Sequence, residues 1–192
     1  CECQPMSLMA LLTGVDAAAI PDYVREVAGE KAKANLQQLM KDAGIKPSYS
    51  GPTLRLLHSG IFSLMTNHEY GVPAYDATQI SEATIRARRE VHAIVADLRK
   101  IGGAWKNIAV VATAEQIGVR DGRRIAGRYT VNKDDVINGA RFDDAVVRPT
   151  FAVDIHALSA EDNKKSAYSN AGVKTKPYDI PLRALIARDV DG

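Results

Sequence analysis

The chain has 192 residues, of which 46% are hydrophobic, so it can bury a substantial core and we expect one domain. Its 25 basic and 23 acidic residues nearly balance, which excludes the global field that attracts nucleic acid or anionic membranes. No apolar run reaches the roughly 18 residues of a membrane-spanning helix, and no signal-peptide pattern is present. Localisation stays open, with the cytoplasm slightly favoured.

The two cysteines, Cys1 and Cys3, form a Cys-x-Cys arrangement. Two thiols are too few for a disulfide framework or for a complete zinc or iron–sulfur site. The tripeptide Asn67-His68-Glu69 offers possible ligand types, but no second cluster lies at ligand spacing. We therefore expect no metal site in this chain.

A strand and a long helix are expected first. Residues 5–13 form an apolar run that ends at Gly14, which is typical of a strand. Pro21 suits a helix start, and Gly44 suits its end. Between them, apolar residues recur on one helical face: Val24, Val27, Ala28, Ala32, Leu36, Leu39 and Met40.

A hairpin and a second long helix follow. Residues 53–57 and 61–65 are strand-like and flank a short turn at Gly60, which predicts antiparallel pairing. Ser81 is the expected N-cap of the helix, and Gly102-Gly103 ends it. Its expected buried stripe is Ile85, Val91, Ile94, Val95, Leu98 and Ile101.

The rest of the chain predicts shorter elements. Strands at residues 107–112 and 124–131 flank a glycine-rich turn, and Asn132 can cap a short helix that ends at Gly139. Two more strands are expected at 151–155 and 182–186, with a polar loop between them at 159–176. The predicted fold class is α+β, with two long helices packed on an antiparallel sheet.

Three arginines, Arg120, Arg123 and Arg124, lie within five positions of that turn. Guanidinium groups do not lose their charge, so holding three together requires nearby anions. A bound carboxylate, phosphate or electron-rich cofactor could supply the negative charge. A structural ion network could do so equally well, through Asp121, Asp143 and Asp144.

Two further pairs are candidate site residues. Asp154 and His156 would project from one face of a strand and could act as a proton-transfer pair, although a histidine that is simply hydrogen-bonded explains the spacing too. Tyr178 and Arg183 lie on either side of Ile180-Pro181. Arg183 could bind an anion there or form a surface salt bridge.

An ordered set of segments resembles a known family. The longest is QIGVRDGRRIAGRYTV at 116–131, followed by DDV at 134–136 and GARFDDA at 139–145. Five more agree in order: CQPMSLM at 3–9, DAT at 76–78, VATA at 111–114, VDIH at 153–156 and YDIPLR at 178–183. Over most of its length the chain thus resembles the FAD-dependent oxidoreductases that include xanthan lyase-like and heterodisulfide-reductase-subunit-like proteins.

The resemblance implies the part of such a flavoprotein that covers the substrate. The sequence contains no Gly-x-Gly-x-x-Gly, the loop that lets a backbone approach the FAD pyrophosphate. We therefore expect residues 1–192 to be one substrate or cap domain excised from a larger FAD-binding chain, inactive and unable to bind FAD alone. An iron–sulfur cluster, found in some such proteins, would lie outside this segment.

The implied partners are the FAD-binding domain of the parent chain and a small anionic or polar substrate, with no nucleic acid or membrane. The flavin would perform the redox step while this domain excludes water and orients the substrate. Asp154 and His156 would be catalytic, and the flavin- or substrate-facing residues would be Arg120, Arg123, Arg124, Tyr178 and Arg183.

Two alternatives belong to other functional classes. An interaction module would dock an acidic partner through the arginines, with binding that weakens steeply as salt rises. A flavin-independent hydrolase or lyase would need a nucleophile or a carboxylate pair, and the sequence offers only Asp154 with His156.

Overall fold

The computed structural model describes residues 3–165, 168–169 and 172–190. The chain divides into two compact units. The larger comprises residues 1–122 and 157–167, and the smaller comprises residues 123–156 and 168–192. Each unit is described separately below.

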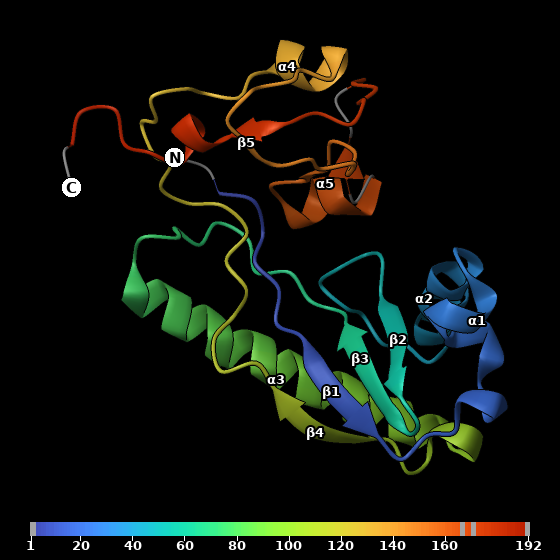
Figure 1. Ribbon diagram of the computed structural model, residues 1–192. Helices are drawn as coiled ribbons and strands as arrows, with labels where there is room; N and C mark the ends of the chain where they lie inside the picture. The colour runs from blue at the N-terminus through green and yellow to red at the C-terminus, as the bar shows by residue number, and fades with distance from the viewer. Residues whose placement is uncertain (1–2, 166–167, 170–171, 191–192) are drawn as a thin grey trace. The chain divides into compact units, whose positions relative to one another are not determined.

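A four-stranded antiparallel sheet forms the centre of the larger unit, in the order β2-β3-β1-β4 (Figure 1). Its strands are β1 (Ala10–Thr13), β2 (Thr53–His58), β3 (Ile61–Met65) and β4 (Ala109–Thr113). The predicted hairpin is confirmed, and Gly60 adopts the positive φ of +73° that its tight turn requires. The first strand is shorter than predicted, because residues 6 and 7 form only isolated bridges.

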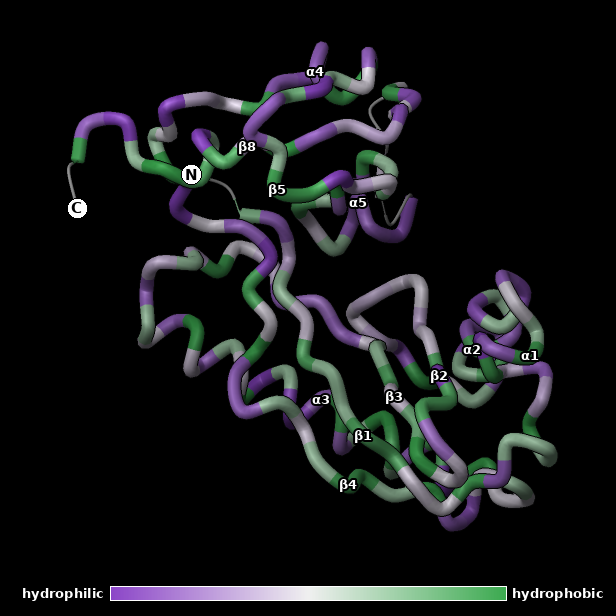
Figure 2. Tube along the Cα trace, in the orientation of Figure 1, coloured by the Kyte–Doolittle hydropathy of each residue, from purple (hydrophilic) through white to green (hydrophobic). Residues whose placement is uncertain are grey.

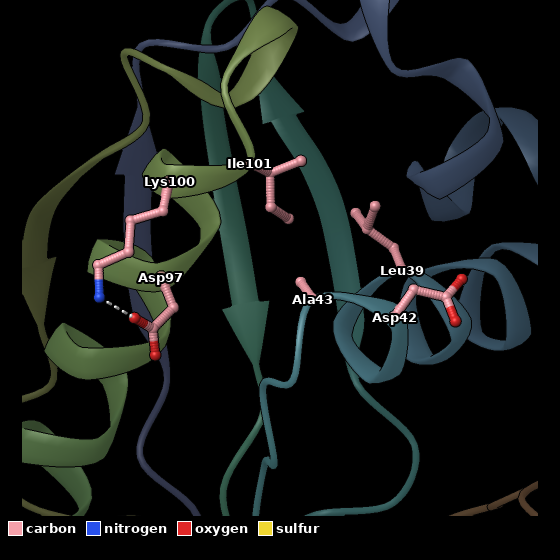
Figure 3. Close-up of a pocket in the computed structure, with 6 residues that line it drawn as sticks. All are labelled: Leu39, Asp42, Ala43, Asp97, Lys100 and Ile101. Carbon is pink, nitrogen blue, oxygen red and sulfur yellow. Dashed lines mark hydrogen bonds and ion pairs between the residues drawn. The ribbon is translucent and has the colours of Figure 1, made fainter.

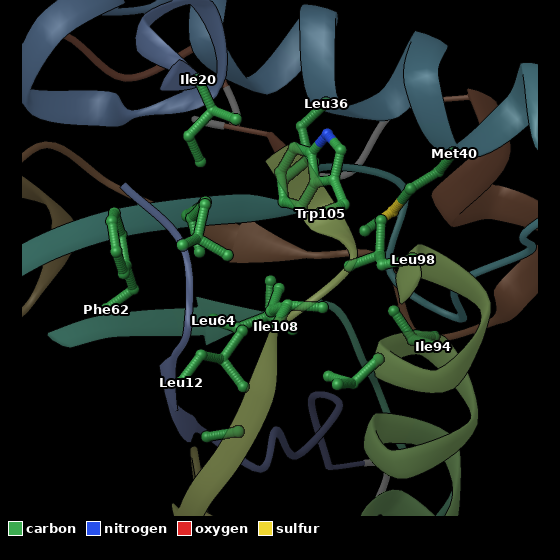
Figure 4. Close-up of a cluster of buried hydrophobic side chains, with 14 of the residues drawn as sticks. Leu12, Ile20, Leu36, Met40, Phe62, Leu64, Ile94, Leu98, Trp105 and Ile108 are labelled. Carbon is green, nitrogen blue, oxygen red and sulfur yellow. The ribbon is translucent and has the colours of Figure 1, made fainter. Parts of the chain in front are cut away.

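Two helices, α2 (Lys31–Asp42) and α3 (Ala77–Ile101), pack their apolar faces against one face of this sheet. Figure 2 shows hydrophilic and hydrophobic residues interleaved along α3, as an amphipathic helix requires. Figure 4 shows side chains of both helices and of the strands in one cluster: Leu36, Met40, Ile94 and Leu98 from the helices, and Leu12, Phe62 and Leu64 from the strands. The predicted α+β class, with an antiparallel sheet packed by helices, is confirmed.

The predicted helix between Pro21 and Gly44 is not continuous. It is broken into a 3-10 turn (η2, Pro21–Tyr23), a single turn α1 (Arg25–Ala28) and α2. Gly29 causes the break because its φ of +60° and ψ of −137° lie outside the helical region. Val27, expected in the buried stripe, is consequently 60% exposed.

The second helix begins earlier than predicted. Asp76, not Ser81, is the N-cap of α3, and its Oδ1 accepts the Gln79 amide at 3.0 Å. Ile85 and Ile101 are exposed, so the predicted stripe was wrong at both ends. The buried residues of α3 are Ala83, Thr84, Ala87, Val91, Ile94, Val95 and Leu98, of which the last four pack in the core that contains the sheet residues.

Shorter elements complete both units. The larger also contains η1 (Ala17–Ala19), η3 (Gly103–Trp105) and α5 (Ala160–Lys165). In the smaller, β5 (Ala145–Val147) pairs with β8 (Ile180–Pro181), and β6 (Ile155–His156) pairs with β7 (Tyr168–Ser169). The predicted helix α4 (Lys133–Asn138) is confirmed, with a capping box of Asn132 and Asp135 and Gly139 in the left-handed region.

Several strand predictions for the smaller unit were wrong. Residues 124–131 form only one bridge, from Gly127 to Ala187, and residues 182–186 begin with a 3-10 turn, η4 (Leu182–Ala184). Of residues 151–155, only the last lies in a strand. The segment 159–176, expected as a loop, contains α5 of the larger unit and β7 of the smaller one, and its residues 166–167 and 170–171 lie outside the described part of the chain. The smaller unit therefore depends on side-chain contacts more than on long ladders of backbone hydrogen bonds.

Candidate functional site

The arginine stretch does not form a hairpin turn. It crosses the boundary between the units, with Arg120 in the larger and Arg123 and Arg124 in the smaller. All three residues are exposed. Ile117 is the anchor on the larger unit's side, buried to 1% exposure, with its amide donating to Thr84 at 3.0 Å.

None of the three carboxylates that could have balanced these arginines pairs with them in the described structure. Asp121 accepts hydrogen bonds from the Gln4 amide at 3.0 Å and the Gln4 side chain at 3.3 Å. Asp144 pairs with Arg183, and Asp143 is exposed. Among the described residues, none of the three arginines forms an ion pair, so their guanidinium groups remain available to an anion.

Asp154 and His156 do come together. Nε2 of His156 lies 3.3 Å from Oδ2 of Asp154, and the imidazole is only 6% exposed while the carboxylate is 27% exposed. This carboxylate can orient the ring, as in a proton-transfer pair. A catalytic role for the pair stays a prediction.

Arg183 lies in an aromatic and acidic cluster of the smaller unit. Its guanidinium pairs with Asp144 and stacks 5.1 Å from the Tyr129 ring centroid and 5.0 Å from that of Phe142. Tyr178 is half-buried, and its amide donates to the Pro149 carbonyl at 3.4 Å. These contacts hold the fold together, and anion binding by Arg183 and Tyr178 stays a prediction.

Asp179 is a buried acid whose role sequence reasoning missed. Its carboxylate is 3% exposed and accepts hydrogen bonds from Arg148 Nε at 2.7 Å, Arg141 Nη1 at 3.5 Å and the Phe142 amide at 3.4 Å. The Arg148 guanidinium, opposed by burial and helped by Phe142 and Arg141, holds the pKa of Asp179 below its ordinary value. The carboxylate thus ties β8 to the segments around β5.

The sheet of the larger unit presents a second face, opposite the helices. Among the residues that alternation along the strands and the pairing register place on it, we call these seven the open face: Met9, Leu11, Thr53, Arg55, Ser63, Met65 and Ala112. Met9 is 41% exposed and Leu11 is 38% exposed. An exposed apolar surface on a sheet is typical of a face that meets a ligand or another domain.

A pocket of about 260 Å³ lies on this open face. Its lining combines two methionines, two hydroxyl residues and three cationic side chains: Met9, Arg25, Lys33, Thr53, Arg55, Ser63 and Met65. No sequence motif signals it, because the residues come from β2, β3, α1, α2 and the position just before β1. Of its cations, Arg55 lies on β2, Arg25 on α1 and Lys33 on α2.

Two other cavities lie beside α2. One, of about 400 Å³, separates the C-terminal ends of α2 and α3, where Lys100 is paired with Asp97 at 2.7 Å (Figure 3). The other, of about 580 Å³, includes three lysines on its rim: Lys41, Lys46 and Lys164. Neither brings together a nucleophile and a base.

A partly buried polar network lies where α3 meets the segment before β2. Glu90 accepts hydrogen bonds from the Ser48 amide at 2.7 Å and the Ser48 hydroxyl at 2.8 Å. The same hydroxyl accepts from the amide of His68, whose Nδ1 lies 3.3 Å from the Tyr70 hydroxyl. Burial raises the pKa of Glu90, with Ser48 opposing the shift, and burial raises that of Tyr70 to about 12. These groups hold the chain's loops together.

The Asn67-His68-Glu69 segment is structural. The Asn67 side chain pairs with both backbone groups of Leu8, at 2.8 and 3.0 Å, and Glu69 forms an ion pair with Arg86 at 2.9 Å. The described part of the chain contains no group of three metal-ligating side chains, and Cys1 lies outside it. No described helix has both the length and the apolar character needed to cross a membrane.

Comparison with known proteins gives one result. No curated protein and no solved structure matches the chain. The model of the family described as FAD dependent oxidoreductase matches residues 1–192, the whole sequence. The chain therefore belongs to the FAD-dependent oxidoreductase family.

Proposed function

We propose that this chain is the substrate-side domain of an FAD-dependent oxidoreductase and that the open face of its sheet covers the flavin ring. The observation that supports this role is the two-sided sheet of the larger unit. Helices α2 and α3 bury one face, whereas the other exposes Met9 and Leu11 beside a cationic pocket. A surface of this kind suits a flat ligand held by another domain.

The residues of this chain fit one part of FAD. Methionine and leucine side chains on the open face offer apolar contact to an aromatic ring, and Lys33 nearby, which forms no ion pair among the described residues, would favour negative charge on the reduced ring. The pyrophosphate requires a glycine-rich loop at a helix N-terminus, which the sequence lacks. In this proposal the FAD-binding domain of the parent chain supplies that loop.

When bound, FAD supplies the redox chemistry. This chain would exclude water from the ring with its open face and would hold an anionic or polar substrate there. The exposed Arg120, Arg123 and Arg124 are further candidates to face substrate or flavin. The hydrogen-bonded Asp154 and His156 would accept or return a proton.

The test uses the FAD-loaded parent protein with Leu11→Lys. Leu11 is exposed, so the fold should tolerate the charge, whereas a lysine on the open face would hinder contact with the ring. We expect lower flavin retention and turnover. Ile85→Lys, at a 47% exposed position on α3, is the matched control and should change neither. Equal effects of both variants would show that the open face has no special role.

A second candidate function rests on the two unpaired arginines of the smaller unit. Arg123 and Arg124 are exposed and form no ion pair among the described residues, so they could dock an acidic partner. Binding to an acidic peptide that falls steeply with salt, and is unaffected by FAD, would favour this interaction module.

A further inference from the structure

We propose that the open-face pocket binds an oxyanion, the carboxylate or phosphate group of a small molecule whose adjoining apolar carbons contact Met9 and Met65. The statement that this oxyanion belongs to the substrate rests on the proposed function, whereas the statement that the pocket binds an oxyanion does not. At about 260 Å³ the pocket is slightly smaller than typical small-molecule sites of roughly 300–1,000 Å³. It therefore suits one head group and a few neighbouring atoms.

The ionised side chains around the pocket carry an excess of positive charge. Arg55 Nε pairs with Glu26 at 2.9 Å, and Arg25 pairs with Glu30. Lys33, the third cation of the lining, forms no ion pair within the described residues. An entering oxyanion would therefore meet one uncompensated ammonium and two guanidinium groups that are already oriented by carboxylates.

Glu26 fixes this arrangement to the sheet. Its Oε2 accepts the amide of Leu56 at 2.7 Å, so the carboxylate satisfies an edge donor of β2 while it holds Arg55. Partial burial opposes ionisation, but the hydrogen bonds from Arg55 and Leu56 lower the pKa of Glu26. The Arg55 guanidinium is thus held by a group that stays ionised over a wide pH range.

Arg25 places part of a guanidinium group at the pocket. Its side chain is 23% exposed, and its Nη1 is buried without a hydrogen-bond partner among the described residues. Because Nη1 is enclosed by the protein, an entering oxyanion would meet the exposed part of the guanidinium group and its positive charge. The hydroxyl group of Ser63, also in the lining, is a suitable further donor, whereas that of Thr53 already donates to the Gly51 carbonyl at 3.0 Å.

The test is a titration of the 192-residue chain at constant ionic strength, followed by amide NMR shifts. Inorganic phosphate and butyrate are the two probes, which distinguish a phosphate from a carboxylate with an apolar tail. We expect at least one of them to shift the amides of Thr53, Arg55 and Ser63 saturably. Lys33→Gln should weaken that binding about fivefold, the effect of one partly exposed charge.

Lys31→Gln is the matched control, because Lys31 is exposed on the same helix and does not line the pocket. It should leave the affinity within about twofold of the original. Ser63→Ala should weaken binding roughly threefold by removing one donor. The proposal is overturned if neither probe binds saturably, or if Lys31→Gln weakens binding as much as Lys33→Gln. Neither result bears on contact between the open face and a flavin, which Leu11→Lys tests in the parent protein.

Discussion

Replacing Gly14 with alanine should destabilise the larger unit strongly, for two separable reasons. Gly14 follows β1 with a φ of +81°, and a Cβ built there lies 1.9 Å from the carbonyl oxygen of Asn107. The backbone conformation alone costs an alanine about 1–2 kcal/mol. Forcing the two backbones apart adds roughly 1–3 kcal/mol, as other overpacked sites do. We therefore expect Gly14→Ala to lower the free energy of unfolding by about 2–5 kcal/mol.

Gly60→Ala isolates the conformational part of this penalty. Gly60 has a similar φ of +73°, but a Cβ there meets nothing within 4 Å. The loss should be about 1–2 kcal/mol, and in both variants it is reduced by roughly 0.4–1 kcal/mol because alanine also restricts the unfolded chain. Urea unfolding followed by the fluorescence of Trp105, the one tryptophan and a core residue of this unit, measures both variants. Equal losses would refute the close approach of residues 14 and 107.

Three other predictions concern pH and cofactor binding. Burial raises the pKa of Glu90 above 4.5, so the stability contributed by its protonated form is lost as pH rises. The Glu90→Gln variant should therefore gain stability relative to the original chain between about pH 4 and about pH 7, as measured by urea unfolding. A difference in stability that stays constant over this range would contradict the prediction. Arg148 lowers the pKa of Asp179 below 3.8, so its stabilisation is present at neutral pH and lost in acid. Asp179→Asn should therefore speed amide exchange in residues 123–156 at neutral pH. Asp162→Asn, at an exposed position on α5, is the control and should leave these rates unchanged. Equal exchange rates in the two variants would argue against a stabilising role for the buried Asp179 carboxylate. The purified chain should emerge colourless from gel filtration with FAD, and a yellow protein would contradict the assignment of the pyrophosphate site to another domain.

The parts of the fold that were predicted correctly depend on contacts between near neighbours. The β2–β3 hairpin needs only a tight turn and two apolar runs, and α4 needs only its cap residues and Gly139. The break at Gly29 was missed because the apolar spacing continues across it, although a glycine can leave the helical region there. Periodicity shows which face of a helix is apolar but not where the surface that packs against it ends. Ile85 was therefore expected to be buried, although it is exposed.

In the candidate site too, contacts between near neighbours could be predicted and contacts between distant segments could not. Asp154 and His156 were paired correctly because two positions along an extended chain share a face. The open-face pocket could not be predicted, since Met9, Arg25 and Ser63 come from separate segments and meet only after the sheet has formed. Asp179 was missed for the same reason, as its partners Arg141 and Arg148 precede it by more than 30 residues.

The accessibility of the methionines tests the central claim most directly. The chain has four, of which Met6 and Met40 are fully buried whereas Met9, on the open face, is 41% exposed. Peroxide oxidation followed by mass spectrometry should modify Met9 in this chain and spare the two buried residues. In the FAD-loaded parent protein, we expect Met9 to be protected too, and to become reactive again when FAD is removed. Oxidation of Met9 at the same rate with and without FAD would contradict the claim that the open face covers the flavin.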